Sequence, residues 1–305
     1  MEEDKKLKKK FSIYLYYLTI PIFFLLILIN YHTRNFQIEA LDVGLMISIV
    51  SFLFGFLITI TFTMLITKMG YLKEALANET GRLTSIYLLS KQLGVQFHAG
   101  IKKRIDDYTI STLKNYKNYE VSREIIYGIY EDVNQAEIKT KNQEVAAASF
   151  LYILGELEPI REKLEYLTSN RVEWSLKFSN YILGGILIAL LFLNRGDTFT
   201  NAIFIILSTT IIFIFLIIED YDNLKIGDYT NNISNSEQLF DLIGEDRYYP
   251  EDTLDRIKLE HGRTYRIGFY DRFQKKERIA KIVYNNEFKS KISSVARKLK
   301  LSKSN

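Results

Sequence analysis

The chain has 305 residues, of which 48% are hydrophobic and 25% charged, with a formal net charge of +4. These averages fit an ordinary globular protein, but the apolar residues are concentrated in four blocks that carry almost no charge. The sequence has no cysteine, which excludes disulfides and thiolate chemistry, and its three histidines are too scattered to form a chelating pair. No common nucleotide-binding or hydrolase motif occurs, so we expect a protein that is not an enzyme.

The first apolar block runs from Phe11 to Tyr31, 21 residues without a charge. As a helix it would be about 31 Å long, which matches the hydrocarbon core of a bilayer. The lysines between Lys5 and Lys10 also resemble the start of a cleaved signal peptide. The apolar run is longer than the core of such a peptide, about 7–15 residues, and no small-residue cleavage site follows it, so we expect a retained membrane helix.

Three more blocks complete the predicted membrane part. Val43 to Thr67 is uncharged over 25 residues and gives residues 1–67 the pattern of an N-terminal transmembrane hairpin. Trp174 to Leu193 predicts a third span if the amine of Lys177 reaches the membrane interface, and Ala202 to Ile218 predicts a fourth. Residues 174–218 therefore form a second predicted hairpin.

Basic residues flank the first hairpin on one side. The lysine cluster precedes the first span, and Lys68 and Lys73 follow the second, whereas the two short loops carry a single arginine each, Arg34 and Arg195. By the positive-inside rule, we expect both termini and residues 68–173 to be cytoplasmic. This layout predicts a multi-pass protein of the cell membrane.

Residues 68–173 show helical spacing of apolar residues. The repeating positions are Leu72, Leu76, Leu83, Ile86, Leu93, Ile101, Ile105, Tyr108, Thr112, Tyr116, Ile126, Ile129 and Val133. We interpret them as the packing faces of a bundle, into which the second span continues. A further helix is predicted from Val145 to Leu157, with Pro159 in the first turn of the next. The predicted fold class is an all-α membrane protein, with four transmembrane helices in two hairpins and a cytoplasmic helical bundle between them.

Residues 219–305 begin with an acidic cluster and end with a basic tail. The cluster contains Glu219, Asp220 and Asp222, and the last 53 residues, 253–305, hold 15 Lys/Arg and 5 Asp/Glu. Such a tail suits the anionic inner leaflet of the membrane or an acidic protein surface. A solvated, partly disordered tail is an equal alternative, and we expect no nucleic acid partner for a membrane-bound chain.

The run Ser51-Phe52-Leu53-Phe54-Gly55-Phe56-Leu57 resembles the second membrane helix of the bestrophin anion channels. The order of two spans, a helical section, two spans and an acidic cluster is also the bestrophin order. The sequence is similar, more closely, to the bacterial bestrophin-like family of uncharacterised membrane proteins, through 74–93 and 219–223. The resemblance covers residues 43 to 245. The chain departs from the family pattern at Ile66-Thr67-Lys68, at Leu224 and at Ser48.

The resemblance implies a homo-oligomer, a pentamer if bestrophin-like, that conducts inorganic anions such as chloride. Ser48, Phe52 and Phe56 lie at i, i+4 and i+8, so they share one face of a helix. In a symmetric ring, such residues would form rings around a pore, and the phenylalanines would form a constriction. The alternative is that both phenylalanines face lipid or neighbouring helices.

The resemblance also implies a regulatory calcium ion at Glu219, Asp220 and Asp222, whose oxygens suit a hard cation. The alternative is that these acids cap the exit of the fourth span or pair with neighbouring lysines. Two functions remain open at this point: an oligomeric ion channel, or a non-conducting membrane-anchored sensor or scaffold. The oligomeric state would separate them, because a channel of this kind needs a ring.

Overall fold

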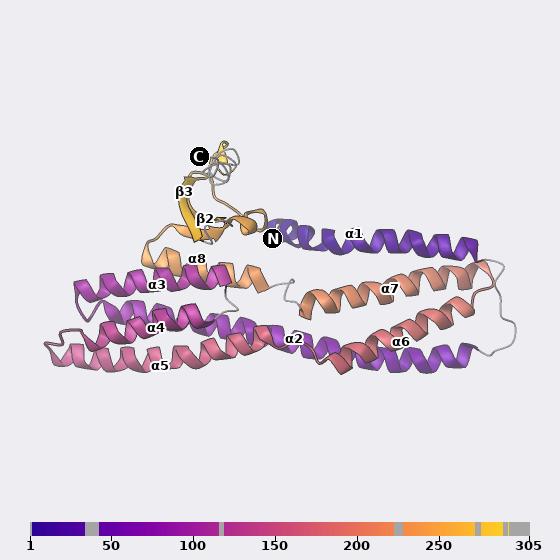
Figure 1. Cartoon of the computed structure of the whole chain (residues 1–305), viewed down its shortest axis with the longest axis horizontal. Coiled ribbons are helices and arrows are strands. Elements are labelled where there is room, and N and C mark those ends of the chain that lie inside the picture. The colour runs from indigo at the N-terminus through magenta and orange to yellow at the C-terminus, as the bar shows by residue number, and fades with distance from the viewer. Residues whose placement is uncertain are drawn as a thin grey trace. The chain divides into compact units, whose positions relative to one another are not determined.

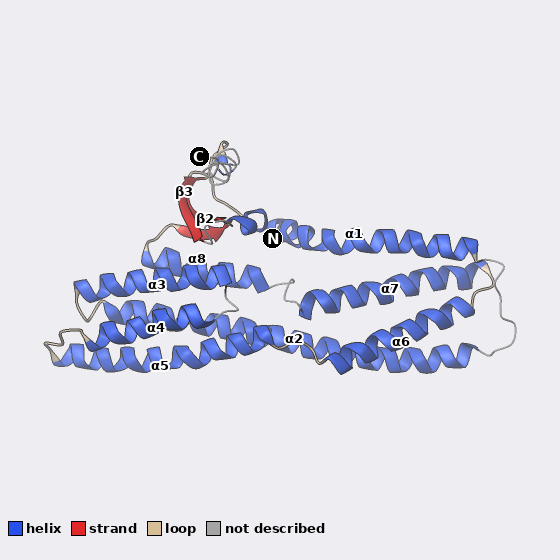
Figure 2. Cartoon of the chain, in the orientation of Figure 1, coloured by secondary structure: helices blue, strands red, loops and turns tan. Residues whose placement is uncertain are grey.

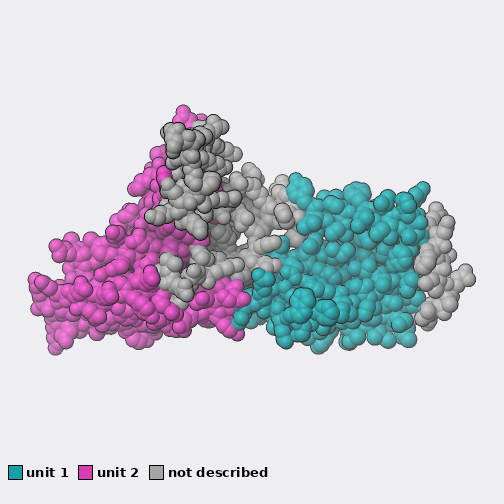
Figure 3. Space-filling model, viewed as in Figure 1, with its two compact units in different colours: residues 1–70, 170–227 teal, residues 71–169, 228–305 magenta. Residues whose placement is uncertain are grey.

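A computed structural model describes residues 2–33, 43–115, 119–222, 228–271, 276–288 and 292. The predicted positions Arg34, Tyr116 and Asn223 and most of the last 17 residues lie outside these ranges. The described chain is mostly helical and divides into two compact units (Figure 3). Unit 1 holds residues 1–70 and 170–227, and unit 2 holds residues 71–169 and 228–305.

Unit 1 consists of long apolar helices that run alongside one another (Figure 1). They are α1 (Glu2–His32), the first part of α2 (Val43–Ser90), α6 (Trp174–Leu193) and α7 (Thr198–Asp222). Leu26 of α1, Phe54 of α2, Leu187 of α6 and Phe204 of α7 meet in its apolar core. The second apolar block continues into a helix of 48 residues, as predicted.

Three stretches of the described chain are long and apolar enough to cross a membrane: Val43–Ser90, Lys141–Leu193 and Thr198–Asp222. In α1 the apolar stretch among the described residues, Tyr17–His32, is shorter. The expected count of four crossings therefore stays a prediction.

Most threonine hydroxyls in these apolar helices are satisfied within their own helix, whereas the buried Ser208 hydroxyl of α7 has no hydrogen-bond partner in the described part of the chain. Thr59, Thr61 and Thr63 of α2 donate to the carbonyls four residues earlier at 2.8–2.9 Å. Thr209 and Thr210 of α7 do the same at 2.7 and 2.9 Å. Because the hydroxyl reuses a carbonyl that is already in the helix, an apolar surrounding does not leave it without a partner.

A glycine lets α6 and α7 approach closely. A Cβ atom on Gly184 would lie 2.3 Å from Cζ of Phe215, so only glycine leaves room for this ring. Phe215 also packs edge-to-face on Tyr181, with ring centroids 4.9 Å apart, and on Phe54 of α2, at 6.0 Å. The Gly184 notch thus positions the ring that joins α6, α7 and α2.

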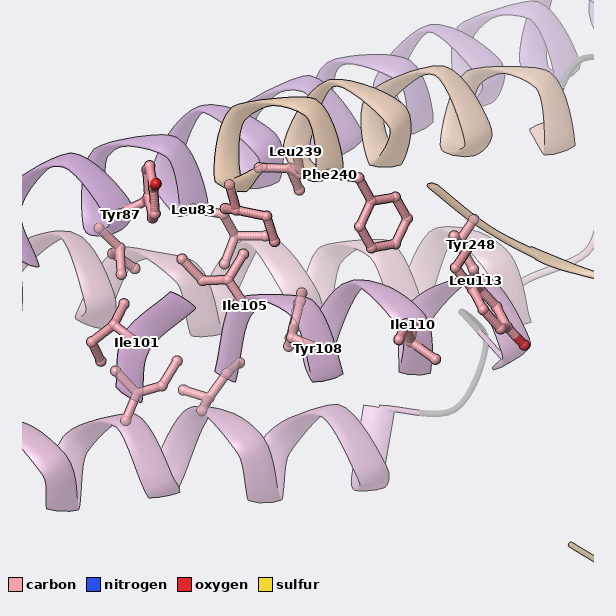
Figure 4. Packing of buried hydrophobic residues seen from close by; sticks show 14 of the residues in the cluster. Leu83, Tyr87, Ile101, Ile105, Tyr108, Ile110, Leu113, Leu239, Phe240 and Tyr248 are labelled. Carbon is pink, nitrogen blue, oxygen red and sulfur yellow. The ribbon is translucent and has the colours of Figure 1, made fainter. Parts of the chain in front are cut away.

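Unit 2 is a helical bundle completed by a small sheet. It contains the rest of α2, α3 (Val95–Asn115), α4 (Tyr119–Asn134), α5 (Lys141–Ser169) and α8 (Asp228–Ile243). The positions singled out by helical spacing are buried wherever their side chains are described. Figure 4 shows several of them, from α2 and α3, gathered between the helices together with Leu239 and Phe240 of α8. The interpretation of these stripes as packing faces is confirmed.

The helix boundary predicted at Pro159 is wrong, because α5 continues through this residue. The helix begins earlier than predicted, at a capping box formed by Thr140 and Gln143. The backbone N–H of Gln143 donates to Thr140 Oγ1, and the backbone N–H of Thr140 donates to Gln143 Oε1, both at 3.2 Å. Phe150, Leu154, Leu157, Arg161 and Leu164 are buried on both sides of Pro159. Continuous burial of one face outweighs the hydrogen bond that proline cannot make.

The all-α prediction is wrong for the C-terminal part, which contains a three-stranded sheet (Figure 2). Strand β1 (Arg247–Pro250) pairs in parallel with β2 (Thr264–Asp271), and β2 pairs antiparallel with β3 (Lys276–Val283). The prediction is wrong because the excess of basic residues in this segment indicated a tail, whereas its apolar residues form strands. Its Tyr, Ile and Phe residues instead complete the core of unit 2: Tyr248, Tyr249, Tyr265, Ile267 and Phe269 are almost fully buried.

One arginine anchors the sheet to the bundle. Arg266 of β2 donates to both oxygens of Asp106 in α3 at 2.6 Å, and its Nε donates to the Asp246 carbonyl at 2.7 Å. The guanidinium also lies over the ring of Phe240 in α8, 5.0 Å from its centroid. Arg266 is buried, so its two-pronged pairing with Asp106 satisfies both charges inside the protein.

Replacing Arg266 with methionine should therefore loosen the sheet from the bundle. The change leaves the partly buried Asp106 carboxylate without its partner, which should cost up to about 3–5 kcal/mol, the typical loss for a fully buried pair. We expect a lower unfolding midpoint in detergent and faster limited proteolysis within residues 247–283. The matched control is Lys102→Met, which removes the partly exposed Lys102–Glu245 ion pair (2.9 Å) and should cost at most about 1 kcal/mol. Equal losses for the two variants would contradict the anchoring role.

The notch at Gly184 predicts a difference between two adjacent glycines. Gly184→Ala should lower the free energy of unfolding by about 1–3 kcal/mol, because the new methyl group displaces the Phe215 ring. Gly185→Ala meets no atom within 4 Å and should be neutral or slightly stabilising, since alanine favours helix. Adding Phe215→Leu to Gly184→Ala should recover part of the loss. If both alanine variants unfold at the wild-type midpoint, the close approach is not structurally important.

Candidate functional site

The first part of α2 has one buried face and one exposed face. Val43, Ile47, Val50, Phe54, Ile58, Thr61 and Leu65 are buried or partly buried and follow three- and four-residue spacing, and Leu57 and Phe62 beside them are partly buried. Phe54 packs on Phe215 of α7, and the Thr61 hydroxyl accepts from the side-chain amide of Asn180 in α6 at 2.7 Å. This face joins α2 to the other helices of unit 1.

The predicted constriction residues lie on the other side of the helix. Phe52 and Phe56 flank Phe54 by two positions, about 160° around the axis from it. The side chains of Phe52 and Phe56 are 75% and 59% exposed, whereas Phe54 is 7% exposed. Ser48 shares their side, is exposed, and donates to the Gly44 carbonyl at 3.0 Å. The three residues form an outward stripe that makes no core contact within unit 1.

Sequence reasoning missed two residues of this stripe. Thr59 and Thr63 are exposed and continue it after Phe56, three and seven positions further along the helix. The stripe therefore carries a hydroxyl at Ser48, two phenyl rings, and then two hydroxyls. Four-residue steps from Phe56 lead to Ile60 and Met64 instead. The threonines are found by turning about 100° per residue, which brings Thr59 and Thr63 back to the side of Ser48 and Phe52.

The acidic residues at the end of α7 surround a lysine of α6. The Lys177 ammonium lies 2.9 Å from Glu219 Oε1 and 2.7 Å from Asp222 Oδ2. The other oxygen of Asp222 accepts from the Val172 backbone N–H at 2.7 Å, and the Tyr181 hydroxyl donates to Glu219 Oε1. We call these five residues the Lys177 cluster. Asp220 follows Glu219 by one position, about 100° around the helix, and is partly exposed.

The expectation that Lys177 reaches outward to the interface is wrong. Lys177 is only 7% exposed and its amine turns inward, because two carboxylates are available within the protein. Tyr181 and Val172 were not predicted as members of the cluster. A signal was present in the sequence: in an antiparallel pair of helices, a lysine near the start of α6 and acids at the end of α7 lie at the same end. Calcium binding by these acids stays a prediction.

No protein-family model matches the sequence, and no curated protein sequence matches it. Solved structures do match. A variant of a bacterial bestrophin homolog from Klebsiella pneumoniae has a TM-score of 0.57 at 11% identity, covering 76% of this chain and 99% of its own. A second variant of that homolog gives 0.56, also at 11% identity with the same coverage. A crystal structure described as a membrane protein gives 0.55 at 11% identity, covering 76% of this chain and 98% of its own.

These structural matches establish the fold, and their low sequence identity carries no conclusion about the activity. The resemblance that the sequence showed in its second apolar block and in the order of its parts is confirmed at the level of the fold. The match takes in nearly the whole of each solved chain, so it is a likeness of complete architectures. This chain has the fold of the bacterial bestrophin homologs.

Proposed function

We propose that this protein is a bestrophin-like, homo-oligomeric ion channel that conducts inorganic anions through a constriction lined by Phe52 and Phe56. The observation that carries the proposal is the outward stripe of α2. It lies opposite the face that α2 uses within unit 1, and two large phenyl rings on it are exposed in a single chain. In a ring of copies, the stripe would line the axis and the two rings would narrow it.

The composition of the stripe favours a pore over lipid. The exposed positions of α6 between Ile182 and Ala189 are all apolar or glycine. The stripe of α2 instead places Ser48 before, and Thr59 and Thr63 after, its two phenylalanines. Hydroxyls on either side of an apolar constriction suit an ion path that is wet at both ends and dewets in the middle.

The proposed channel crosses the cell membrane four times, with both termini and unit 2 in the cytoplasm. The apolar blocks and the basic flanks at Lys5–Lys10, Lys68 and Lys73 support this topology. The bestrophin fold supports a ring, which we propose to be a pentamer.

Single cysteines test the topology, because the chain has none of its own. Cysteines at Asn35 and Gly196 should react with an impermeant thiol reagent in intact cells, whereas cysteines at Ser111 and Ser294 should react only after the membrane is opened. The readout is the mass shift of the labelled protein. Labelling of Ser111→Cys in intact cells would reverse the proposed orientation.

Removing both rings tests the constriction. In the double variant Phe52→Ala/Phe56→Ala, the apolar narrowing becomes wider and wetter, so anion flux into liposomes should rise severalfold or lose its gating. The measurement is halide flux with purified, reconstituted protein, together with the oligomer mass by light scattering.

The matched control replaces two apolar residues of α2 that lie beside the stripe, Leu53→Ala/Ile60→Ala, and flux should stay near the wild-type value. Identical conduction and selectivity in the Phe52/Phe56 variant, with an active wild type and an unchanged oligomer, would remove the constriction. A wild-type protein without flux at any voltage, calcium level or pH would instead support the scaffold function.

A further inference from the structure

The Lys177 cluster brings a fixed positive charge to the place where the resemblance implies a calcium ion. The ammonium of Lys177 lies within 2.9 Å of Glu219 and 2.7 Å of Asp222. Both Lys177 and Asp222 are almost completely buried, at 7% and 2% exposure. A buried ammonium with two carboxylates at these distances has its charge satisfied inside the protein.

Two hydrogen bonds of the cluster also join its segments without a metal ion. Asp222 uses its second oxygen for the Val172 N–H, and Glu219 accepts from the Tyr181 hydroxyl. A calcium ion takes six to eight oxygen ligands at about 2.3–2.6 Å. Among the described residues, no three acidic or histidine side chains converge in a way that could hold a metal ion. A divalent cation at these carboxylates would also meet the charge of Lys177.

We infer that the Lys177 ammonium is a built-in substitute for a divalent cation, so that the cluster holds its segments together without calcium. A metal ion bound by Glu219 and Asp222 would draw the end of α7 toward its neighbours. Lys177 instead holds the end of α7 to α6 through its ion pair with Asp222. Asp222 also binds the linker between α5 and α6, because it accepts a hydrogen bond from the Val172 N–H. Leu65 of α2, Val172 and Ile218 of α7 pack together beside the cluster. The inference does not depend on ion conduction.

Removing the ammonium should convert the cluster into a calcium site. Without Lys177, two carboxylates remain side by side and repel each other, which raises their affinity for a divalent cation. The experiment uses full-length protein purified in detergent and compares unfolding midpoints in chelator and in millimolar calcium. Wild type should give the same midpoint in both. Lys177→Gln should unfold several degrees earlier in chelator, and calcium should restore at least half of the loss.

Two further variants show where the ion acts. Lys177→Arg keeps the positive charge and should remain indifferent to calcium. Lys177→Gln/Asp222→Asn should lose the response to calcium, because the buried carboxylate is gone. If Lys177→Gln does not yield folded protein, Lys177→Ser, which leaves more room for an ion, takes its place in the same comparison.

Terbium luminescence, excited through nearby tyrosines, measures metal binding directly. It can be applied to the wild-type protein, so this test does not require that a variant folds. Wild type should bind no terbium that calcium can displace, whereas Lys177→Gln should. The inference is overturned if wild type is stabilised by calcium or binds displaceable terbium. It is equally overturned if neither the glutamine nor the serine variant responds to calcium.

Discussion

Polar groups in apolar helices need partners inside the protein, and this requirement determines how unit 1 is built. The threonines of α2 and α7 meet it within their own helix, through carbonyls one turn away. Longer polar side chains meet it across helices. Asn180 donates to Thr61, and Arg195 donates to Asn30, Thr33 and the Phe192 carbonyl, which ties the end of α1 to the α6–α7 connection.

These polar contacts sit at opposite ends of the α6–α7 pair. Arg195 lies at one end and Lys177 at the other, with the Gly184 notch and the Phe215 ring between them. Hydrogen bonds and ion pairs are directional, whereas apolar packing is not, so the polar contacts fix the register in which the helices meet. Phe54 of α2 packs on the Phe215 ring, so this register also helps to set which face of α2 points outward.

The sequence was a good guide wherever a local property decided the structure. Uncharged runs gave the helices of unit 1, and α6 has the predicted bounds, Trp174–Leu193. Apolar spacing gave the buried faces of α2, α3 and α4, because a helix that packs on one side shows its period. The spacing of Ser48, Phe52 and Phe56 placed them on one face, which the structure reproduces. Whether that face lines a pore is a property of an assembly, which no local pattern in a single chain determines.

Predictions failed where a distant partner decided the outcome. Lys177 turns inward because of acids 42 and 45 positions later in the chain. Residues 247–283 form strands because α3 and α8 offer them a core, although their net charge suggested a solvated tail. Pro159 sits within a helix because burial on both sides of it outweighs a local preference. In each case a tertiary contact was stronger than the local signal.

The division of unit 2 between two stretches of chain has a consequence for biosynthesis. Its core takes Leu83, Ile105 and Phe150 from the first stretch, and Phe240 and Tyr265 from the second, with α6 and α7 made in between. During translation, the helices of the first stretch keep part of their apolar surface exposed until α6 and α7 have been made and the strands emerge. Arg266 can reach Asp106 only then, so the bundle acquires its final stability as one of the last events of synthesis. A ribosome stalled before residue 264 would hold a chain with finished apolar helices and an incomplete core of unit 2, the form that quality-control proteases are best able to recognise.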